Sequence, residues 1–284
     1  SPATVLCQYW HKTVAGERPP LDLPADRPAA DSANFIPARY VFCIDRQITR
    51  ALRRLAKEEE STFYALLLAA FQVFLYRYTG QPQLQIGAPI LGRAKRDFAS
   101  LVGDFSNIVI LHGEIDPAEP FARALHRMTA TVQNALLHQH YPFSLLTQEL
   151  VSKDDSIQGG FFQASINLLS LPRRLRKLAP VFAEPTAAHP VEFGGFTIAR
   201  LDIEPGQGTG PLDLSLNLFD RKESVAVHLD YNSVRFDEAT IRRMMGHFMA
   251  LLQGILRDPS QTVATLPLLT AAEEHQLLVT WNAT

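Results

Sequence analysis

Residues 101–150 decide the fold, and they read LVGDFSNIVILHGEIDPAEPFARALHRMTATVQNALLHQHYPFSLLTQEL. The unbroken apolar run at 108–111 is typical of a strand that is buried on both faces. Asp116 and Pro117 then predict the start of a helix, because Asp caps helices and Pro is accepted in their first turn. Tyr141 marks a break after 138–140, since Pro142 disfavours helical backbone at the residue before it, and a short helix follows. Spacings of three and four give the long helix one apolar face, with Phe121, Leu125, Met128, Val132 and Leu136.

The rest of the chain alternates between predicted strands and helices, which indicates an α/β domain. Alternating or apolar runs predict strands at 40–44, 83–89, 161–169, 196–203, 212–219 and 225–231. Helices are expected at 49–60, 62–78 and 237–256, the second with Ser61 as N-cap and Gly80 as C-cap. The helix at 62–78 is apolar nearly all round, so it should pack on a sheet and on other helices. We expect a two-layer mixed sheet of roughly five or six strands with helices on one main face, and a loop at 171–195.

Composition excludes several classes of protein. The chain has 284 residues and a net charge of -2, so no basic surface argues for nucleic acid. The basic run at 173–177 is interpreted as a solvated loop rather than a partner-binding patch. Cys7 and Cys43 are too few for a disulfide scaffold or a structural zinc site, and they suit a reducing cytosol. Residues 63–78 fall short of the roughly 20 apolar residues of a membrane span, and no signal peptide is visible. We expect a cytoplasmic protein that contacts neither membrane nor nucleic acid.

Two short motifs carry a resemblance to a known family. VGDFSN at 102–107 and HQHYPF at 138–143 resemble the "I-G-x-F-V-N-T" and "[HN]-Q-D-Y-P-F-E" signatures of the condensation domains of nonribosomal peptide synthetases. The chain departs from these patterns at four positions, where Ser106, Ile108, His140 and Ser144 stand in place of Val, Thr, Asp and Glu. The order of the two motifs along the chain is that of the family.

Further matches extend the resemblance along nearly the whole chain. LPADRP at 23–28 resembles the crossover between the two lobes of the family, and GAPILGR at 87–93 resembles its "G-x-P-x-x-G-R". FFQ at 161–163 resembles the end of the seventh motif, whose "R-D-x-S-R-N" half is missing here. DLSL at 213–216 and the pattern at 231–241 also match. The resemblance divides the chain into a crossover segment at 1–30, a lobe at 31–270 and the start of a linker at 271–284.

The resemblance implies a chloramphenicol-acetyltransferase-like lobe and a part in peptide-bond formation. The family's "H-H-x-x-x-D-G" motif, which serves the acceptor amine, belongs to the N-terminal lobe, and no His-His pair occurs here. The chain therefore resembles the C-terminal lobe, one wall of the substrate tunnel, and is expected to be inactive alone. Implied partners are the N-terminal lobe, donor and acceptor peptidyl carrier proteins, and a downstream adenylation domain. The phosphopantetheine arm belongs to the carrier, so no cofactor of this chain is expected.

The same resemblance suggests which residues matter. Candidates for the tunnel or the lobe interface are Arg93, Ser106, Asn107, Asp213 and Ser215. Gly103, Phe105, Tyr141, Pro142 and Phe143 are expected to be structural members of the motifs. A segment that reaches the other lobe could start in the loop at 205–211. For Arg93 a surface position, and for Asn107 a structural hydrogen bond to a loop, remain alternatives.

Two other functions stay open on the sequence. A recruitment or scaffold relative of the same fold is compatible with the departures from the motifs. A free-standing acyltransferase would use His112 and Asp116, which fit a loose H-x-x-x-D pattern, but Asp116 as a helix cap is the simpler interpretation. A metal at His138 and His140 is not expected, because residues two apart do not share a helix face.

Overall fold

A six-stranded mixed sheet forms the centre of the molecule. The computed structural model describes residues 2–15, 19–28, 35–92, 101–151, 161–183, 190–199 and 212–282. The strand order is β1-β8-β7-β4-β2-β3, in which β4 runs parallel to both β2 and β7 and the other neighbours are antiparallel. The strands are β1 (Pro37–Ile44), β2 (Gln83–Ile90), β3 (Asn107–Glu114), β4 (Ala164–Ser170), β7 (Leu214–Asp220) and β8 (Val225–Asn232). The expected mixed sheet and the hairpin of β7 and β8 are confirmed.

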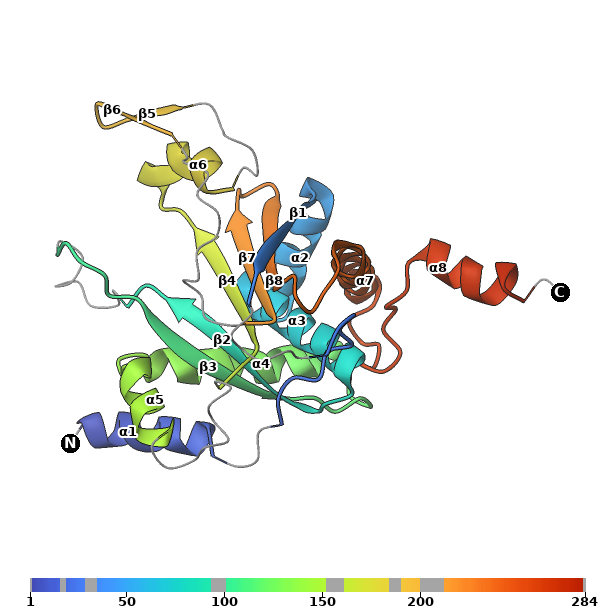
Figure 1. The fold of residues 1–284 in the computed structure, drawn as a ribbon, viewed down its shortest axis with the longest axis horizontal. Helices are drawn as coiled ribbons and strands as arrows, with labels where there is room; N and C mark the ends of the chain where they lie inside the picture. Colours follow the sequence, from blue (N-terminus) through green and yellow to red (C-terminus); the bar gives the residue numbers. More distant parts are fainter. Residues whose placement is uncertain are drawn as a thin grey trace.

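Helices cover one face of this sheet as a second layer (Figure 1). They are α2 (Arg46–Glu58), α3 (Phe63–Thr79), α4 (Phe121–Leu137) and α7 (Glu238–Arg257). The central helix α3 is buried nearly all round, and its Phe71 and Phe74 pack against Phe248 of α7 at ring-centroid distances of 6.3 and 5.6 Å. The two-layer arrangement follows because a sheet face and an apolar helix each need an apolar partner.

Two further helices lie together beside β3. They are α1 (Pro2–Thr13), which precedes the Pro-rich connector at 19–28, and α5 (Phe143–Val151), which follows the second motif (Figure 1). Trp10 of α1 is buried, and its Nε1 donates to the backbone oxygen of His138 at 2.9 Å. Leu23 of the connector joins the same hydrophobic core. The first segment of the chain is thus packed onto the rest of the domain.

The connector is extended, as its prolines predict, and it ends on α7. Asp26 accepts hydrogen bonds from the backbone N–H of Asp237 and from Thr240 Oγ1, both at 2.8 Å. Arg27 donates to the backbone oxygen of Val234 and to the carboxylate of Asp237. Asp237 is the N-cap residue of α7 but makes no side-chain cap bond of its own. The connector therefore supplies the cap that this helix needs at its first turn.

Several helix boundaries differ from the expectation. The N-cap of α3 is Thr62, not Ser61, because the Thr62 hydroxyl accepts from the N–H of Ala65; Gly80 is the C-cap with φ 69°, as predicted. Asp116 does not start α4. Residues 117–120 pair instead with 262–264, through bonds from Val263 to Glu119 and from Ala264 to Pro117, so the helix begins at Phe121. The expected inward position of Leu136 is also wrong, since it is 42% exposed while Ala135 is buried.

Residues 171–195 are not only loop. They contain a 3₁₀ helix, η4 (Arg173–Leu178), then α6 (Ala179–Ala183), and the strand β5 (Val191–Phe193), which pairs with β6 (Phe196–Ile198). The basic run at 173–177 therefore lies on a helical turn. The chain ends in α8 (Ala271–His275) and η5 (Gln276–Thr280), which project away from the body of the domain (Figure 1). No described helix has both the length and the apolar character to cross a membrane.

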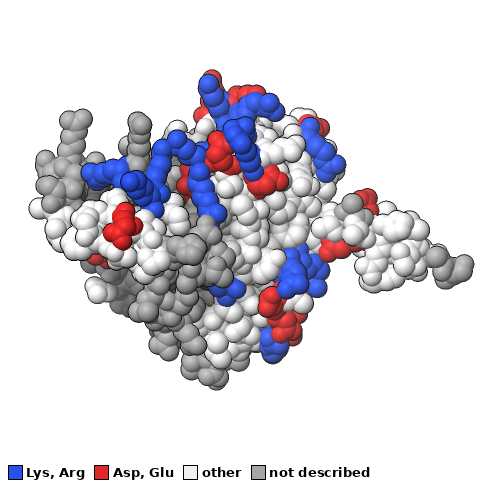
Figure 2. All heavy atoms as spheres, turned by 90° about the horizontal axis from the view of Figure 1, so that it is seen from above, with Lys and Arg blue, Asp and Glu red and all other residues white. Residues whose placement is uncertain are grey.

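Charges at the end of the molecule that carries α2 are largely balanced. Figure 2 shows acidic side chains set among the Lys and Arg side chains of this end. The ion pairs are Arg46 and Arg50 with Glu223, Arg53 with Asp220, and Arg54 with Glu58. The pairs of Arg46, Arg50 and Arg54 are exposed and contribute little to stability, whereas the pair of Arg53 with Asp220 is partly buried. All of them reduce the net field of the arginines.

Candidate functional site

Asn107 ties the two motifs at 102–107 and 138–143 together. Its Nδ2 donates to the backbone oxygens of Gln139 at 3.0 Å and Tyr141 at 2.8 Å, and its Oδ1 accepts from the N–H of Phe143 at 2.9 Å. One side-chain amide thus satisfies backbone groups that the break between α4 and α5 removes from helical bonding. Asn107 makes the structural hydrogen bond to a loop that the sequence allowed. Its place in a substrate tunnel stays a prediction.

The first motif meets the segment after β2 at Gly92. Gly92 has φ 63°, and a Cβ there would overlap the carbonyl oxygen of Phe105, so only glycine fits this approach. Gly103 has φ 153°, close to the half-buried Phe105 ring. Ser106 is exposed, and its N–H and hydroxyl both donate to Asp104 Oδ1. Arg93 and the loop at 205–211 lie outside the described residues, so their predicted roles stay predictions.

The second motif is held by packing. Tyr141 is buried and donates its hydroxyl hydrogen to Glu149 Oε2 at 2.8 Å. Burial, together with hydrogen bonds to Glu149 and Cys7, raises the pKa of the Tyr141 hydroxyl above its ordinary value. The carbonyl of Pro142 accepts from the N–H of Leu145 and so opens α5. Phe143 packs edge-on against the Phe161 ring at 5.9 Å. All three predicted motif residues therefore have packing or backbone contacts.

Asp213 lies just before β7 and forms an ion pair with Arg235. Both side chains are largely buried, with exposed fractions of 7% and 16%. Burial raises the pKa of the Asp213 carboxyl, and the Arg235 guanidinium offsets part of that rise. The backbone N–H of Asp213 also donates to the carbonyl of Gln163 at 2.9 Å, which links β7 to the segment before β4. The sequence did not indicate Arg235, because 22 residues and a whole hairpin separate it from Asp213.

Ser215 belongs to a polar row that crosses four strands. Along the sheet register its partners are Asp230 on one side and Ser165 on the other, and Asp230 is in turn opposite Arg39. The hydroxyls of Ser165 and Ser215 are hydrogen-bonded at 2.8 Å, and Arg39 makes a two-pronged ion pair with Asp230. The neighbouring residues of β7, Leu214 and Leu216, are fully buried.

This row faces away from the helix layer. Successive side chains of a strand alternate between the faces of a sheet, so Ser215 lies opposite to Leu214 and Leu216. A Cβ on Gly113 of β3 would meet Gln72 of α3, so Gly113 faces the helix layer. Its register partner on β2 is Leu84, and Ile86, two residues on, points to the same side of the sheet. Ile86 pairs with Ala164 of β4, and Ala164 pairs with Leu214 of β7, so Leu214 also faces the helices. Sequence alternation places Ser215 on this face but does not reveal Ser165, Asp230 and Arg39 as its neighbours, because register between distant strands is not local.

His112 and Asp116, the alternative acyltransferase pair, have separate surroundings. His112 lies in β3 opposite Gln85, while Asp116 is exposed and accepts from the N–H of Ala118 at 2.9 Å in the turn before α4. His112 lines a cavity of about 50 Å³ with Gln85 and Gln163 beneath the connector.

Comparison with known proteins identifies the family. The Condensation domain family model matches residues 6–278. One of the proteins that make up linear gramicidin synthase in Brevibacillus parabrevis is 31% identical over 276 residues, which are 97% of this chain but 5% of that protein. Tyrocidine synthase 3 of the same organism is 30% identical over 274 residues, which are 96% of this chain and 4% of that protein. The chain thus spans a small part of the curated relatives that it matches.

Solved structures share the fold. A four-domain nonribosomal peptide synthetase bound to AMP and glycine matches with a TM-score of 0.78 and 20% identity, over 96% of this chain and 20% of that one. The first condensation domain of the calcium-dependent antibiotic synthetase matches with a TM-score of 0.70 and 22% identity, over 95% of this chain and 54% of that one. The X-domain from teicoplanin biosynthesis gives 0.76 and 18%, over 95% and 58%. By the family match over nearly its full length, the chain belongs to the condensation domains of nonribosomal peptide synthetases.

Proposed function

We propose that this chain is the C-terminal lobe of a condensation domain and forms one wall of a tunnel between two carrier-bound substrates. In this reaction the acceptor amine attacks the donor thioester carbonyl, the new C–N bond replaces the C–S bond, and the amine proton balances the released thiol. The phosphopantetheine arms would belong to the donor and acceptor carrier proteins. A following adenylation domain would be reached through the segment at 271–284.

The extent of the structural match supports the lobe assignment. The chain aligns with 54% of the calcium-dependent antibiotic synthetase domain and 58% of the X-domain, so each of those chains has a remainder that this chain does not match. The His-His motif that the resemblance assigns to the N-terminal lobe does not occur in the sequence. Both observations support a role in which this chain shapes the tunnel and another lobe supplies the histidine.

The polar row on β1, β8, β7 and β4, on the side of the sheet that faces away from the helix layer, is the observation that carries the tunnel-wall proposal. A sheet face that only closes a hydrophobic core carries apolar side chains, whereas this face carries Arg39, Asp230, Ser215 and Ser165. Hydroxyl and amide groups suit a channel for a pantetheine arm, which contains amides and a hydroxyl along an otherwise apolar chain. Ser215 is the predicted tunnel residue that lies in this row.

Reconstitution tests the lobe assignment. Donor and acceptor carrier proteins loaded with aminoacyl thioesters are mixed with this chain, with and without an N-terminal condensation lobe that carries the His-His motif. We expect amide product only when both lobes are present. Mass spectrometry of the acceptor carrier protein detects it as an added donor residue. Product from this chain alone would overturn the proposal and return His112 as the candidate base, which His112→Ala would then check.

A bulky substitution tests the tunnel wall. In the two-lobe protein, Ser215→Leu places a larger apolar side chain in the polar row and should lower amide formation at least about tenfold. Gln47→Leu is the matched control, because Gln47 is an exposed residue of α2 in the helix layer. Far-ultraviolet circular dichroism and urea midpoints confirm that both variants are folded. Equal rates in a folded Ser215→Leu variant and in the control would contradict a substrate role for this face.

A recruitment role is the second candidate. Its support is the likeness to the X-domain from teicoplanin biosynthesis, whose complex with OxyB matches with a TM-score of 0.77 at 17% identity. A protein of this kind would bind a partner enzyme through the same fold and join no amino acids. Absence of amide product from the two-lobe protein, with its histidine pair shown to be replaced, would favour this function.

A further inference from the structure

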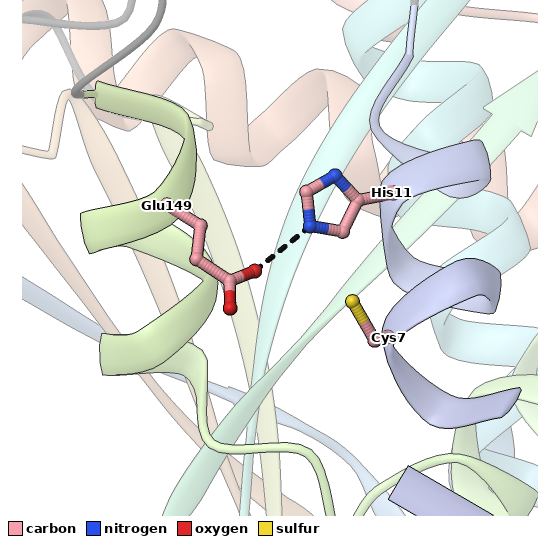
Figure 3. Close-up of side chains that lie close together, drawn as sticks. All are labelled: Cys7, His11 and Glu149. Carbon is pink, nitrogen blue, oxygen red and sulfur yellow. Dashed lines mark hydrogen bonds and ion pairs between the residues drawn. The ribbon is translucent and has the colours of Figure 1, made fainter. Parts of the chain in front are cut away.

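Three metal-binding side chains converge where α1 meets α5. Cys7 and His11 are four residues apart on α1 and so share one face of the helix, and Glu149 of α5 points toward them (Figure 3). The Cys7 Sγ, one His11 ring nitrogen and one Glu149 carboxylate oxygen all lie within 4.8 Å of one another. His11 Nε2 and Glu149 Oε2 are 2.8 Å apart. We propose that these three residues form a binding site for Zn²⁺.

The spacing of the ligand atoms fits a small tetrahedral ion. Zinc bonds of about 2.0–2.3 Å at tetrahedral angles place ligand atoms roughly 3.3–3.7 Å from one another. The 2.8 Å between His11 Nε2 and Glu149 Oε2 is shorter than this, and the 4.8 Å limit on all three separations is longer, so the ligand atoms lie within about 1.5 Å of tetrahedral spacing. All three side chains are half-buried, so an ion can enter from solvent.

Both helices that carry the ligands are held in position by contacts outside the cluster, which favours metal binding. Trp10, next to His11, is buried and donates to the carbonyl of His138. The Tyr9 ring stacks on the His138 ring at a centroid distance of 3.7 Å. Helix α5 follows directly from the turn that Asn107 holds. The ligands therefore need little ordering when an ion binds.

Glu149 is also oriented by a group that does not bind the ion. The Tyr141 hydroxyl donates to Glu149 Oε2 at 2.8 Å, and the Tyr141 side chain is buried. Hydrogen bonds of this type fix the orientation of ligating carboxylates and strengthen metal binding. Tyr141 would thus hold the carboxylate in place.

The chemistry of the ligands selects the metal class. A thiolate with an imidazole favours Zn²⁺ and related transition ions, whereas Mg²⁺ and Ca²⁺ prefer oxygen ligands alone. A thiol must lose its proton to bind the ion, so affinity should fall as pH is lowered. Three protein ligands leave the fourth position to water. The ion would join α1 to α5 and so attach the first helix to the lobe.

Cysteine count alone does not reveal this site. Two cysteines are too few for a zinc site made of thiolates, but one thiolate suffices when His and Glu complete the set. The i, i+4 spacing of Cys7 and His11 was the available signal, and the third ligand lies 138 residues away from His11. The metal-free alternative is that His11 and Glu149 only form an ion pair between the two helices.

Cobalt substitution tests the proposal on the purified protein. We expect the wild type, freed of metal by a chelator, to bind one Co²⁺ with a thiolate-to-cobalt charge-transfer band, and Zn²⁺ to displace it. Cys7→Ser should remove the band and weaken Zn²⁺ binding by more than about 100-fold, and Tyr141→Phe should weaken it by about tenfold. Cys43→Ser is the matched control, because Cys43 is the exposed cysteine on β1 and lies outside the cluster.

Thermal unfolding provides a second readout that does not depend on absorption. Zn²⁺ should raise the Tm of the wild type and of Cys43→Ser but not of Cys7→Ser or His11→Gln. Equal Tm values of wild type and Cys7→Ser in chelator show that the variant is folded. No charge-transfer band in the wild type, or an unchanged band in Cys7→Ser, would overturn the proposal and leave the metal-free ion pair.

Discussion

The side-chain amide of Asn107 donates a hydrogen bond of 2.8 Å to the backbone carbonyl of Tyr141, 34 residues further along the chain. This bond connects the start of β3 to the turn between α4 and α5. The two motifs that indicated the family are therefore one structural unit, in which the strand supplies the side chain and the turn supplies the backbone. Strand β3 and helix α4 lie between the two motifs in the sequence, so their lengths set the spacing of the motifs along the chain.

We predict that Asn107→Ala lowers the free energy of unfolding by about 1–3 kcal/mol. The variant loses hydrogen bonds to Gln139, Tyr141 and Phe143 and leaves partly buried backbone groups without that partner. Urea unfolding followed by circular dichroism measures the change. Ser106→Ala is the control, because Ser106 is exposed and bonds Asp104, and its effect should stay within about 0.5 kcal/mol. Equal stability of the two variants would show that the amide does not hold the turn.

Asp26 gives a second prediction, on the attachment of the connector. Asp26→Ala should destabilise the protein by about 1 kcal/mol, because it removes the cap that the connector supplies to α7. Asp22→Ala is the matched control, since Asp22 is exposed in the same connector and its N–H, which the substitution keeps, bonds Gln81.

The pH dependence of the same variant supplies an independent check. The backbone N–H of Asp237, the Thr240 hydroxyl and nearby arginines lower the pKa of Asp26, against a smaller effect of burial. A lowered pKa in the folded state means that the stabilisation is present above the unfolded-state pKa and is lost as pH falls through the folded-state pKa. The difference between wild type and Asp26→Ala should therefore shrink in acid. A difference that does not change with pH would contradict capping by the ionised carboxylate.

Sequence patterns predicted the parts of the fold that depend on neighbouring residues. Gly80 ends α3 and the β7–β8 hairpin forms as expected, because a left-handed cap and a polar turn are local features. The start of α4 was predicted wrongly because residues 117–120 pair with 262–264, and that pairing is set by tertiary structure. Ser61 was chosen over Thr62 because adjacent hydroxyl residues give the same signal.

The candidate site shows the same division. Asn107 and Ser215 were named as candidates from the family resemblance, and their roles in a tunnel stay predictions. Their partners were not named, since the turn at 138–143, Ser165 and Asp230 reach them only through long-range register. The cap from Asp26 to Asp237 joins residues 211 apart, so no local pattern could show it. Side-chain identity is thus readable from sequence, while the contacts that fix its role come from the sheet.

The ion pair of Asp213 and Arg235 leads to a third prediction, in which removal of Asp213 costs less stability than removal of Arg235. Burial raises the pKa of Asp213 even beside Arg235, so the neutral side chain of Asp213→Asn should be tolerated with a loss of no more than about 1 kcal/mol. Arg235→Met instead leaves a buried carboxylate without its cation and should cost about 3 kcal/mol at neutral pH. Arg242→Met is the control, because its pair with Glu238 is exposed and contributes little.

The sign of the pH effect follows from the raised pKa. A folded-state pKa above the unfolded value means that stability is highest below the unfolded-state pKa and declines as pH rises through the folded-state pKa. Removal of Arg235 enlarges this shift, so Arg235→Met should recover stability relative to wild type as pH is lowered. Urea midpoints at neutral and mildly acidic pH measure it. Greater damage from Asp213→Asn than from Arg235→Met would contradict the prediction, because it would show that the unpaired Arg235 cation costs more than the unpaired Asp213 carboxylate.

A chain of hydrogen bonds attaches α8 to the domain and gives the last prediction. Tyr78 of α3 bonds His247 Nδ1 at 2.6 Å, and His247 Nε2 bonds Glu273 Oε1 at 2.9 Å. The other oxygen of Glu273 accepts from the N–H and hydroxyl of Thr270, which completes a capping box. Burial raises the pKa of Glu273, but the hydrogen bonds from Thr270 and His247 together lower it by more, so the pKa lies below its ordinary value.

Acid should therefore loosen α8 before the sheet unfolds. With a lowered folded-state pKa, the stabilisation by Glu273 is present above the unfolded-state pKa and is lost as pH falls through the folded-state pKa. Hydrogen exchange at 271–282, corrected for intrinsic rates, should rise about five- to tenfold, which corresponds to about 1 kcal/mol of local stability.

Glu273→Gln can keep the capping bonds but removes the charge, so its exchange should vary less with pH. Glu274→Gln, at the exposed neighbouring residue, should behave like wild type. The same pH dependence in both variants would assign the opening of α8 to another group.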